Sequence, residues 1–398
     1  MVNKPVTFLL VIIAFVISAV GSYFYFGQGA VHYLSAVKYQ APVGNNASSD
    51  TPVDTGEPKT EECPINGAMY GKSQKEKWKK RRPLGIMIEN HKEARPQSGI
   101  SSADVVYEAV AEGGITRTLD IFYCQDAPYV GPVRSARMHF MKMLREYGNY
   151  PLYAHVGGAN CDEETGSGCK NGAKADALGT INKLGWAGYN DMNQFSVPFP
   201  VYYRDPDRLP NRATEHTVYS STQKLWTYAA QKRNLTNVDS KGVSWDTTFT
   251  PWKFQDDAAS SSRGTVNTIQ FGFWDQSTSD FGVQWQYDTA SNSYKRTNGG
   301  EPHLDKNTGK QLTAKNVAII FADESPANDG YEGGHILYDL AGSGKALVFQ
   351  NGAAIKATWN KKNEESRTRF LDDTGKEISF VRGQIWIEIL PTGNKVTY

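Results

Sequence analysis

Residues 104–124 read DVVYEAVAEGGITRTLDIFYC, and this pattern is the strongest architectural signal in the chain. Two runs rich in Val, Ile, Thr, Tyr and Phe lie on either side of Gly113-Gly114. β-Branched and aromatic residues favour strands, and paired glycines supply the positive φ angles of a tight hairpin turn. The stretch therefore predicts two strands, over 104–112 and 115–124, joined by a two-residue turn.

The segments around this hairpin predict a mixed α/β unit over residues 63–235. Residues 84–90, LGIMIEN, form a short apolar run ended by polar residues, which is typical of a buried strand. The other expected elements are a helix over 134–147, a strand over 151–158, and a helix through Lys232 that begins with a capping box of Ser220 and Gln223.

Beyond residue 240 the pattern is dominated by strands. Val283, Trp285 and Tyr287 alternate with polar residues, and further apolar runs follow between turns rich in Gly and Asp. Residues 236–398 are therefore assigned to a second unit. The predicted fold class is α+β: an N-terminal mixed α/β sandwich-like domain, then a smaller β-rich domain, preceded by one transmembrane helix.

The N-terminus predicts the location of the protein. Residues 6–26 carry no charge, and a helix of that length spans a bilayer's hydrocarbon core. Lys4 precedes this segment, so the rest of the chain is expected outside the cytoplasm. We assign residues 1–27 to a single-pass anchor in the cell membrane and residues 28–62 to a flexible tether. The alternative is a cleaved signal peptide.

The composition excludes some classes of function. The 398 residues include 43 Lys and Arg and 42 Asp and Glu, so the formal net charge is +1. A dedicated nucleic-acid binder normally shows a basic stripe, and we expect no nucleic-acid partner. The hydrophobic content of 39% excludes a mostly disordered chain.

Four cysteines in an exported chain indicate disulfides. Cys161 and Cys169 bracket a short loop that can close locally, which leaves Cys63 and Cys124 as a long-range pair. Three pairings exist for four cysteines, so this assignment is a hypothesis.

The sequence predicts no metal centre and no cofactor. Residues 342–345, GSGK, lack the flanking residues of a phosphate-binding P-loop and predict a hairpin turn instead. The histidines show no metal-ligand spacing; they are His32, His91, His139, His155, His216, His303 and His335.

Arginines provide the candidate ligand-binding groups. Arg134 and Arg137 lie at the start of the predicted helix, where a cation is locally unfavourable unless an anion compensates it. Free amides and guanidiniums together favour a phosphate or a carboxylate. The alternative is a structural network in which Glu89, Asp104, Glu108 or Glu112 supplies the negative charge.

Other polar residues follow the same elements. His91, Arg95 and Gln97 lie on the loop after the strand at 84–90, and Arg117 follows the glycine turn. His155 precedes Gly157-Gly158; its alternative role is that of a hydrogen-bonded core histidine. The predicted ligand-binding set is Arg95, Arg117, Arg134, Arg137, His91, Gln97 and His155.

Glu108 and Glu112 are the candidate catalytic residues. They share strand parity, so both are expected on one surface, where two carboxylates can perform acid/base chemistry on a glycan. That role requires one of them to have a raised pKa. The alternative is that both form salt bridges.

Several long motifs make the chain recognisable. Residues 82–117, GPVRSAR at 131–137 and HVGG at 155–158 closely resemble the YerB-like family of bacterial exported lipoproteins, a domain of unknown function. Residues 294–317, TWNK at 358–361 and GQIWIEILP at 383–391 resemble the second domain of that family. The resemblance implies a two-part fold and an envelope location, but no reaction. This chain has no cysteine after its apolar segment, so lipidation is not carried over.

These observations predict a membrane-anchored extracytoplasmic protein that binds an anionic envelope ligand through an arginine-lined cleft. Cell-wall peptide carboxylates and a polyol-phosphate polymer are the candidate ligands. One alternative is a hydrolase or transferase acting on cell-wall glycan or peptidoglycan. Another is a protein-interaction scaffold that uses the tryptophans of the β-rich unit, Trp252, Trp274, Trp285, Trp359 and Trp386.

Overall fold

A computed structural model describes residues 56–398 of the chain. The predicted anchor at residues 6–26 and the tether up to residue 55 lie outside the described residues. Within residues 56–398, no helix is both long enough and apolar enough to cross a membrane.

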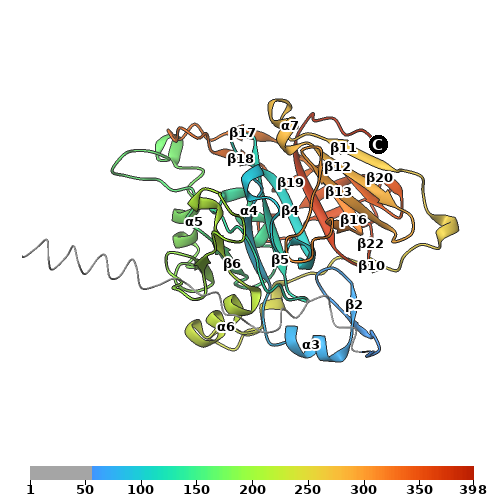
Figure 1. Ribbon diagram of the computed structural model, residues 1–398, viewed down its shortest axis with the longest axis horizontal. Helices are drawn as coiled ribbons and strands as arrows, with labels where there is room; N and C mark the ends of the chain where they lie inside the picture. Colours follow the sequence, from blue (N-terminus) through green and yellow to red (C-terminus); the bar gives the residue numbers. More distant parts are fainter. Residues whose placement is uncertain (1–55) are drawn as a thin grey trace, which may run out of the picture. The chain divides into compact units, whose positions relative to one another are not determined.

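A ten-stranded mixed sheet organises the described chain (Figure 1). In spatial order its strands are β21 (Arg369–Leu371), β20 (Ala353–Lys361), β19 (Gly342–Gln350), β16 (Asn316–Ala322), β23 (Ile385–Pro391), β4 (Val105–Glu112), β5 (Ile115–Phe122), β3 (Leu84–Glu89), β6 (Leu152–His155) and β7 (Asp191–Asn193).

The predicted hairpin lies near the middle of this sheet as β4 and β5, and its turn is confirmed. Glu112 lies opposite Ile115, and Gly113 and Gly114 have φ angles of 56° and 78°. Two consecutive positive φ angles are what a two-residue hairpin turn needs, and glycine adopts them without steric cost. The pairing register shifts between Val110 and Glu112 because β4 carries an irregularity there.

Strands from both predicted units build the same sheet. The last strand, β23, runs parallel to β4, with Ile385 opposite Val105 and Glu388 opposite Glu108. Figure 1 shows the blue-green strands β4 and β5 beside the orange and red strands of the C-terminal half. The division at residue 235 stays a prediction from the sequence, and the sheet is continuous across it.

A second sheet packs on one face of the large one. Its strands are β11 (Thr268–Phe271), β12 (Val283–Asp288), β13 (Ser293–Asn298), β14 (Glu301–Pro302) and β15 (Thr313–Ala314). Trp285 on β12 meets Trp386 on β23 edge to face, with ring centroids 5.2 Å apart. The alternation predicted for residues 283–287 is confirmed, since Val283, Trp285 and Tyr287 are buried.

In Figure 1, α4 (Met138–Leu144), α5 (Ala177–Lys183) and α6 (Thr222–Arg233) lie on the opposite side of the large sheet from β11, β12 and β13. The short α7 (Thr278–Phe281) lies beside β11, and α3 (Lys72–Trp78) precedes β3 in the chain. Beneath α4, the hydroxyls of Tyr107 on β4 and Tyr147 lie 2.9 Å apart. The fold is thus α+β with strands in the majority.

Two predicted helix starts are wrong. The helix expected from residue 134 begins at Met138, because the extended backbone at Arg134 bonds to Met87 on β3 and to Val156. The cap of α6 is Ser221, whose hydroxyl accepts the Lys224 amide hydrogen at 3.2 Å. Ser220 instead donates to the Val201 carbonyl.

Two loop predictions are also corrected. Residues 342–345 are not a hairpin turn; they begin β19 and pair with the far end of β20, where Gly342 lies opposite Lys361. Residues 56–62, predicted as tether, include β1 (Glu61–Glu62), which pairs with β2 (Met69–Tyr70). The remaining short pairs are β8 (Tyr203–Arg204) with β9 (Val218–Tyr219), β10 (Phe254–Gln255) with β22 (Phe380–Val381), and β17 (Glu324–Pro326) with β18 (Ile336–Tyr338).

The two disulfides have the pairing that the spacing predicts. Cys63 is joined to Cys124, and Cys161 to Cys169. The long-range bond ties the start of the folded unit to the end of β5, and the short one closes the loop after β6.

Asp120 places a carboxyl in the middle of the sheet. It lies on β5 between Ile86 and Val106 of the neighbouring strands and is fully buried. Burial, with the nearby carboxylates of Asp305 and Glu108, raises the pKa of Asp120 to about 8. Folded Asp120 therefore keeps its proton at pH values where an unfolded chain has lost it.

We expect the free energy of unfolding to fall as the pH rises from about 4 to about 8, because only the folded state retains this proton. Each retained proton is worth about 1.4 kcal/mol per pH unit inside that window. In Asp120→Asn the side chain is always neutral, so the variant should lose less stability than the wild type. Urea unfolding near pH 5 and pH 8 measures the two slopes.

Asp373→Asn is the matched control, because Asp373 is exposed on the turn that follows β21. This variant should keep the wild-type slope. Equal slopes for the wild type and Asp120→Asn would contradict the retained proton.

Candidate functional site

Three of the four predicted arginines come together on one face of the large sheet. Arg117 on β5 and Arg137, just before α4, both contact the carboxylate of Glu112; the Arg117 Nη2–Glu112 Oε1 distance is 2.5 Å. Arg134 pairs with Glu89 at the end of β3, with Nε 3.1 Å from Oε1. We call these five residues the arginine cluster.

Acidic partners neutralise most of the arginine cluster. Burial alone would raise the pKa of Glu112, but Arg117 and Arg137 outweigh it and lower the value to about 2. The Arg117 and Arg137 side chains are only 4% and 6% exposed, whereas that of Arg134 is 26% exposed. Arg134 is therefore the member of the cluster that an external anion reaches most readily. Glu112 lacks the raised pKa that a general acid needs.

The expectation that Glu108 and Glu112 share a surface is wrong. The register shift between Val110 and Glu112 turns Glu112 toward Arg117, while Glu108 faces the second sheet. A bulge adds a residue to one strand and so reverses the alternation beyond it. The two carboxylates therefore lie on opposite faces of β4.

Glu108 belongs to a buried charge network between the two sheets. Its carboxylate lies 2.5 Å from Nη2 of Arg296 on β13 and accepts bonds from Asn90 and Thr116. Glu388 on β23 approaches the same guanidinium, with Oε1 3.8 Å from Nε, and accepts the Trp285 indole N–H. All three charged side chains have 0% exposure. Burial and the Glu108 charge raise the pKa of Glu388 to about 8.

Arg95 lies apart from the arginine cluster, and Gln97 contacts it only through the Glu89 backbone. Arg95 donates to the backbone and side-chain oxygens of Asn90, at 2.8 and 3.0 Å. Gln97 donates to the Glu89 carbonyl and bonds to the His303 ring, which also contacts Arg296. Arg95 lines a small pocket of about 300 Å³ together with residues of the second sheet.

His155 matches the alternative of a hydrogen-bonded core histidine. It is fully buried, and both ring nitrogens are bonded: Nε2 to Asp191 at 2.6 Å and Nδ1 to the Gly157 carbonyl at 2.7 Å. His155 is therefore held in place by internal bonds.

The tryptophans named for the scaffold alternative are mostly in the core. Trp252, Trp285, Trp359 and Trp386 are buried. Trp274 is partly exposed and donates its indole N–H to Glu324. They do not form an exposed aromatic surface.

Two histidines and a glutamate form a cluster that the sequence did not predict. Side-chain atoms of His91, Glu93 and His216 lie within 4.8 Å of one another. The His91 and His216 rings are stacked, with centroids 5.1 Å apart. No local spacing signals this group, because His216 comes from a distant segment just before β9 and meets the loop after β3 only in the folded chain.

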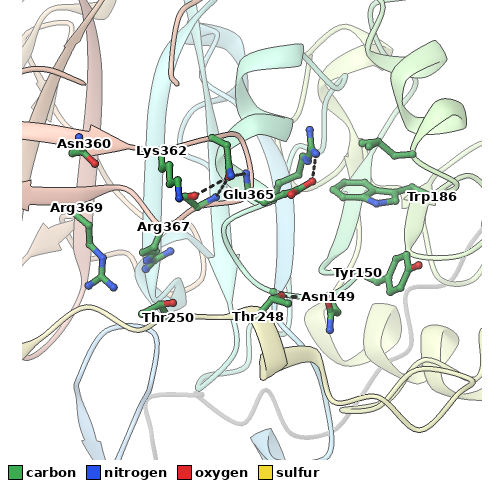
Figure 2. A pocket seen from close by; sticks show the side chains of 15 residues that line it. Asn149, Tyr150, Trp186, Thr248, Thr250, Asn360, Lys362, Glu365, Arg367 and Arg369 are labelled. Carbon is green, nitrogen blue, oxygen red and sulfur yellow. Dashed lines mark hydrogen bonds and ion pairs between the residues drawn. The ribbon is translucent and has the colours of Figure 1, made fainter. Parts of the chain in front are cut away.

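A cavity of about 740 Å³ lies elsewhere, and we call it the basic pocket. Its walls come from the segment after α4, the end of α5, residues 248–250, and the β20–β21 connection. Figure 2 shows Trp186 and Tyr150 on one side of the pocket and Lys362, Arg367 and Arg369 on the other. The lining contains four cationic side chains, Arg145 included, and one carboxylate, Glu365.

Arg367 is the most unusual member of this lining. Its side chain is 1% exposed, and none of its three nitrogens has a hydrogen-bond partner. The guanidinium lies 3.4 Å from the centre of the Trp252 ring and 4.5 Å from that of Tyr147. The Glu146 carboxylate is 3.6 Å from Nη1, so the charge is compensated inside the protein.

The other cations differ in how firmly they are engaged. Arg145 pairs with Glu364 and Glu365, and Arg369 pairs with Glu377. Lys362 is exposed and has no ion-pair partner within residues 56–398. The pocket can therefore offer positive charge to an anion and aromatic faces to a sugar ring. In the sequence, the charged run KKNEESRTR at 361–369 was the feature that could have pointed to this pocket. The sequence does not show that this run contacts the segment after α4, because that contact forms only in the folded chain.

A buried ion pair anchors this side of the pocket. Glu146, just after α4, accepts the Lys361 ammonium at 2.8 Å and also bonds to the backbone and hydroxyl of Thr368. Both charged side chains are 0% exposed, and burial lowers the pKa of Lys361. Glu146 thus holds the β20–β21 connection against the helical side of the fold.

Comparison with known proteins confirms the resemblance carried by the motifs. Residues 70–236 match the N-terminal domain, and residues 268–387 the C-terminal domain, of the family described as protein of unknown function DUF3048. The chain is 29% identical over 327 residues to the putative lipoprotein YerB of Bacillus subtilis strain 168, covering 82% of this chain and 86% of that protein. The crystal structure of YerB from Bacillus subtilis matches with a TM-score of 0.64 and 27% identity, covering 85% of this chain and 100% of that one.

We expect Glu146→Gln to lower the free energy of unfolding by about 3–5 kcal/mol, because it leaves the buried Lys361 without a counter-charge. Glu365→Gln is the matched control: the Glu365 side chain is 68% exposed in its pair with Arg145. That change should cost less than about 1 kcal/mol. Denaturant unfolding of both variants measures the difference, and a similar small loss in both would contradict an anchoring role for Glu146.

Proposed function

The chain belongs to the DUF3048 family, and from this premise we propose that it is a membrane-anchored extracytoplasmic protein that binds an anionic envelope polymer in the basic pocket. The polymer we propose carries phosphate groups between sugar or polyol units. The excess of cationic side chains over carboxylates in the lining of the basic pocket is the observation that carries this proposal.

The location rests on three features that agree. The relative from Bacillus subtilis is described as a putative lipoprotein, which implies attachment at the outer face of a membrane. Residues 6–26 of this chain are uncharged and long enough to anchor it without a lipid. Both disulfides favour an oxidising compartment outside the cytoplasm.

The ligand class follows from the groups that the pocket leaves available. Lys362 is exposed and has no ion-pair partner within residues 56–398, whereas the Arg367 nitrogens lie beneath the surface and only add positive charge to the pocket wall. Phosphate oxygens satisfy the Lys362 ammonium as acceptors of charge-assisted hydrogen bonds. Tyr150, which is 37% exposed, offers a ring face on which a sugar can stack, and the buried Trp186 lines the same side of the pocket.

The arginine cluster is the alternative location for the proposed anion site. Its support is the partial exposure of Arg134. Arg117 and Arg137 already share Glu112, so the cluster offers less unpaired positive charge than the basic pocket. The binding experiment below includes Arg134 for this reason.

We expect the full-length chain in detergent micelles to bind short poly(glycerol phosphate) oligomers, and to bind them more weakly as salt screens the charges. Lys362→Ala should weaken binding about tenfold, the effect of losing one charge-assisted hydrogen bond of about 1.4 kcal/mol. Isothermal titration calorimetry at two salt concentrations gives both quantities.

Lys356→Ala is the matched control, because Lys356 is an exposed lysine of β20, the strand that Lys362 directly follows, and it lies outside the basic pocket. It should bind like the wild type, as should Arg134→Ala. Weakening by Arg134→Ala but not by Lys362→Ala would move the site to the arginine cluster. Binding of carboxylate-bearing peptidoglycan fragments in preference to the phosphate oligomer would overturn the proposed ligand class.

A further inference from the structure

We infer that His91, Glu93 and His216 form a binding site for a divalent transition-metal ion of the zinc class. One side-chain ligand atom from each residue lies within 4.8 Å of the other two. Imidazole nitrogens and a carboxylate oxygen are the donors that zinc accepts in three-ligand sites. The inference is independent of the polymer ligand, since none of the three residues lines the basic pocket.

Two separate loops bring the donors together. His91 caps the single-turn helix Lys92–Ala94 after β3, and its Nδ1 accepts the Glu93 amide hydrogen at 3.3 Å. His91 gives up this bond when it binds a metal ion, because an imidazole with Nδ1 as acceptor carries its proton on Nε2. His216 ends the turn Thr214–His216, just before β9. The His91 and His216 rings stack with planes 2° apart, so the His91 ring must rotate before both imidazoles point a nitrogen at one ion.

Glu89 orients His216 for metal binding. The Glu89 Oε2–His216 Nδ1 distance is 2.8 Å, so the protonated Nδ1 can donate to the carboxylate while Nε2 remains a bare donor for a metal. That Nε2 faces Glu93, with Oε2 3.6 Å away. Metal-binding histidines almost always bond their second nitrogen to such an acceptor. Arg134 fixes the other oxygen of Glu89 at 3.1 Å.

Charge and access also suit a cation. Glu89 and Glu93 bring two negative charges, and Arg134 offsets only one of them. The Glu93 side chain is 44% exposed and His91 is partly exposed, so an ion can enter from solvent. Binding would draw the donor atoms together by about 1 Å to reach tetrahedral spacing, through rotation of the exposed Glu93 and partly exposed His91 side chains toward the buried His216.

Other pairs of histidine and carboxylate in the described part of the chain lack a third metal-ligating side chain. The pairs His155–Asp191 and His335–Asp329 each bring together one histidine and one carboxylate. The other three-residue cluster consists of Cys63, Asp104 and Cys124, whose sulfurs are joined in a disulfide. With three protein ligands, the site at His91 leaves a coordination position open for water or a ligand oxygen, as catalytic zinc sites do.

The test uses the full-length chain, purified in micelles without a polyhistidine tag, and Zn²⁺ alone as the probe. Calorimetric titration should show one zinc ion per chain. Glu93→Gln should weaken binding at least about tenfold, and His216→Gln should remove the site. Co²⁺ loading should give the visible absorption of a tetrahedral cobalt centre in the wild type and lose it in His216→Gln.

His335→Gln serves as the matched control, because His335 also pairs with a carboxylate but has no third ligand nearby. It should keep the wild-type stoichiometry and affinity. Glu93 is exposed enough that its replacement leaves the packed interior intact, so a loss of zinc in Glu93→Gln reports the site itself. Absence of saturable zinc binding, or equal affinity in the wild type and Glu93→Gln, would overturn the inference.

Discussion

Arg296 is the single cation that two neighbouring carboxylates share at the junction of β23 and β4. Glu108 and Glu388 lie opposite each other on these parallel strands, and the guanidinium from the second sheet reaches both. Removing one partner of a fully buried network leaves charge uncompensated, at a typical cost of about 3–5 kcal/mol. The charge network therefore forms only when β4, β23 and β13 are all in place. In this way it links the N-terminal half of the chain to the C-terminal half, and the large sheet to the second sheet.

This coupling explains where the candidate sites occur. Because β23 lies beside β4, the strands of the C-terminal half continue the sheet that carries the N-terminal helices. The β20–β21 connection can then reach the segment after α4, where Glu146 binds Lys361. The basic pocket is the space that this contact encloses, so neither half of the chain forms it alone.

A single irregularity in β4 separates two kinds of chemistry. Before the register shift, Glu108 faces the second sheet and serves the buried network; after it, Glu112 faces the helices and serves Arg117 and Arg137. Of the two glutamates, one is fully buried and the other has its pKa lowered by arginines. Both are consistent with the salt-bridge alternative that the sequence left open.

Local features of this protein were predictable from the sequence because they depend on neighbours along the chain. The hairpin at Gly113-Gly114, the alternation at Val283 and Tyr287, and the loop closed by Cys161 are of this kind. Long-range pairing was needed for the rest: Arg134 is extended because β3 and Val156 bind its backbone, and His216 reaches His91 across distant loops. Side-chain periodicity reports which face of a strand is buried, but it carries no information about which strand lies alongside or how the register shifts.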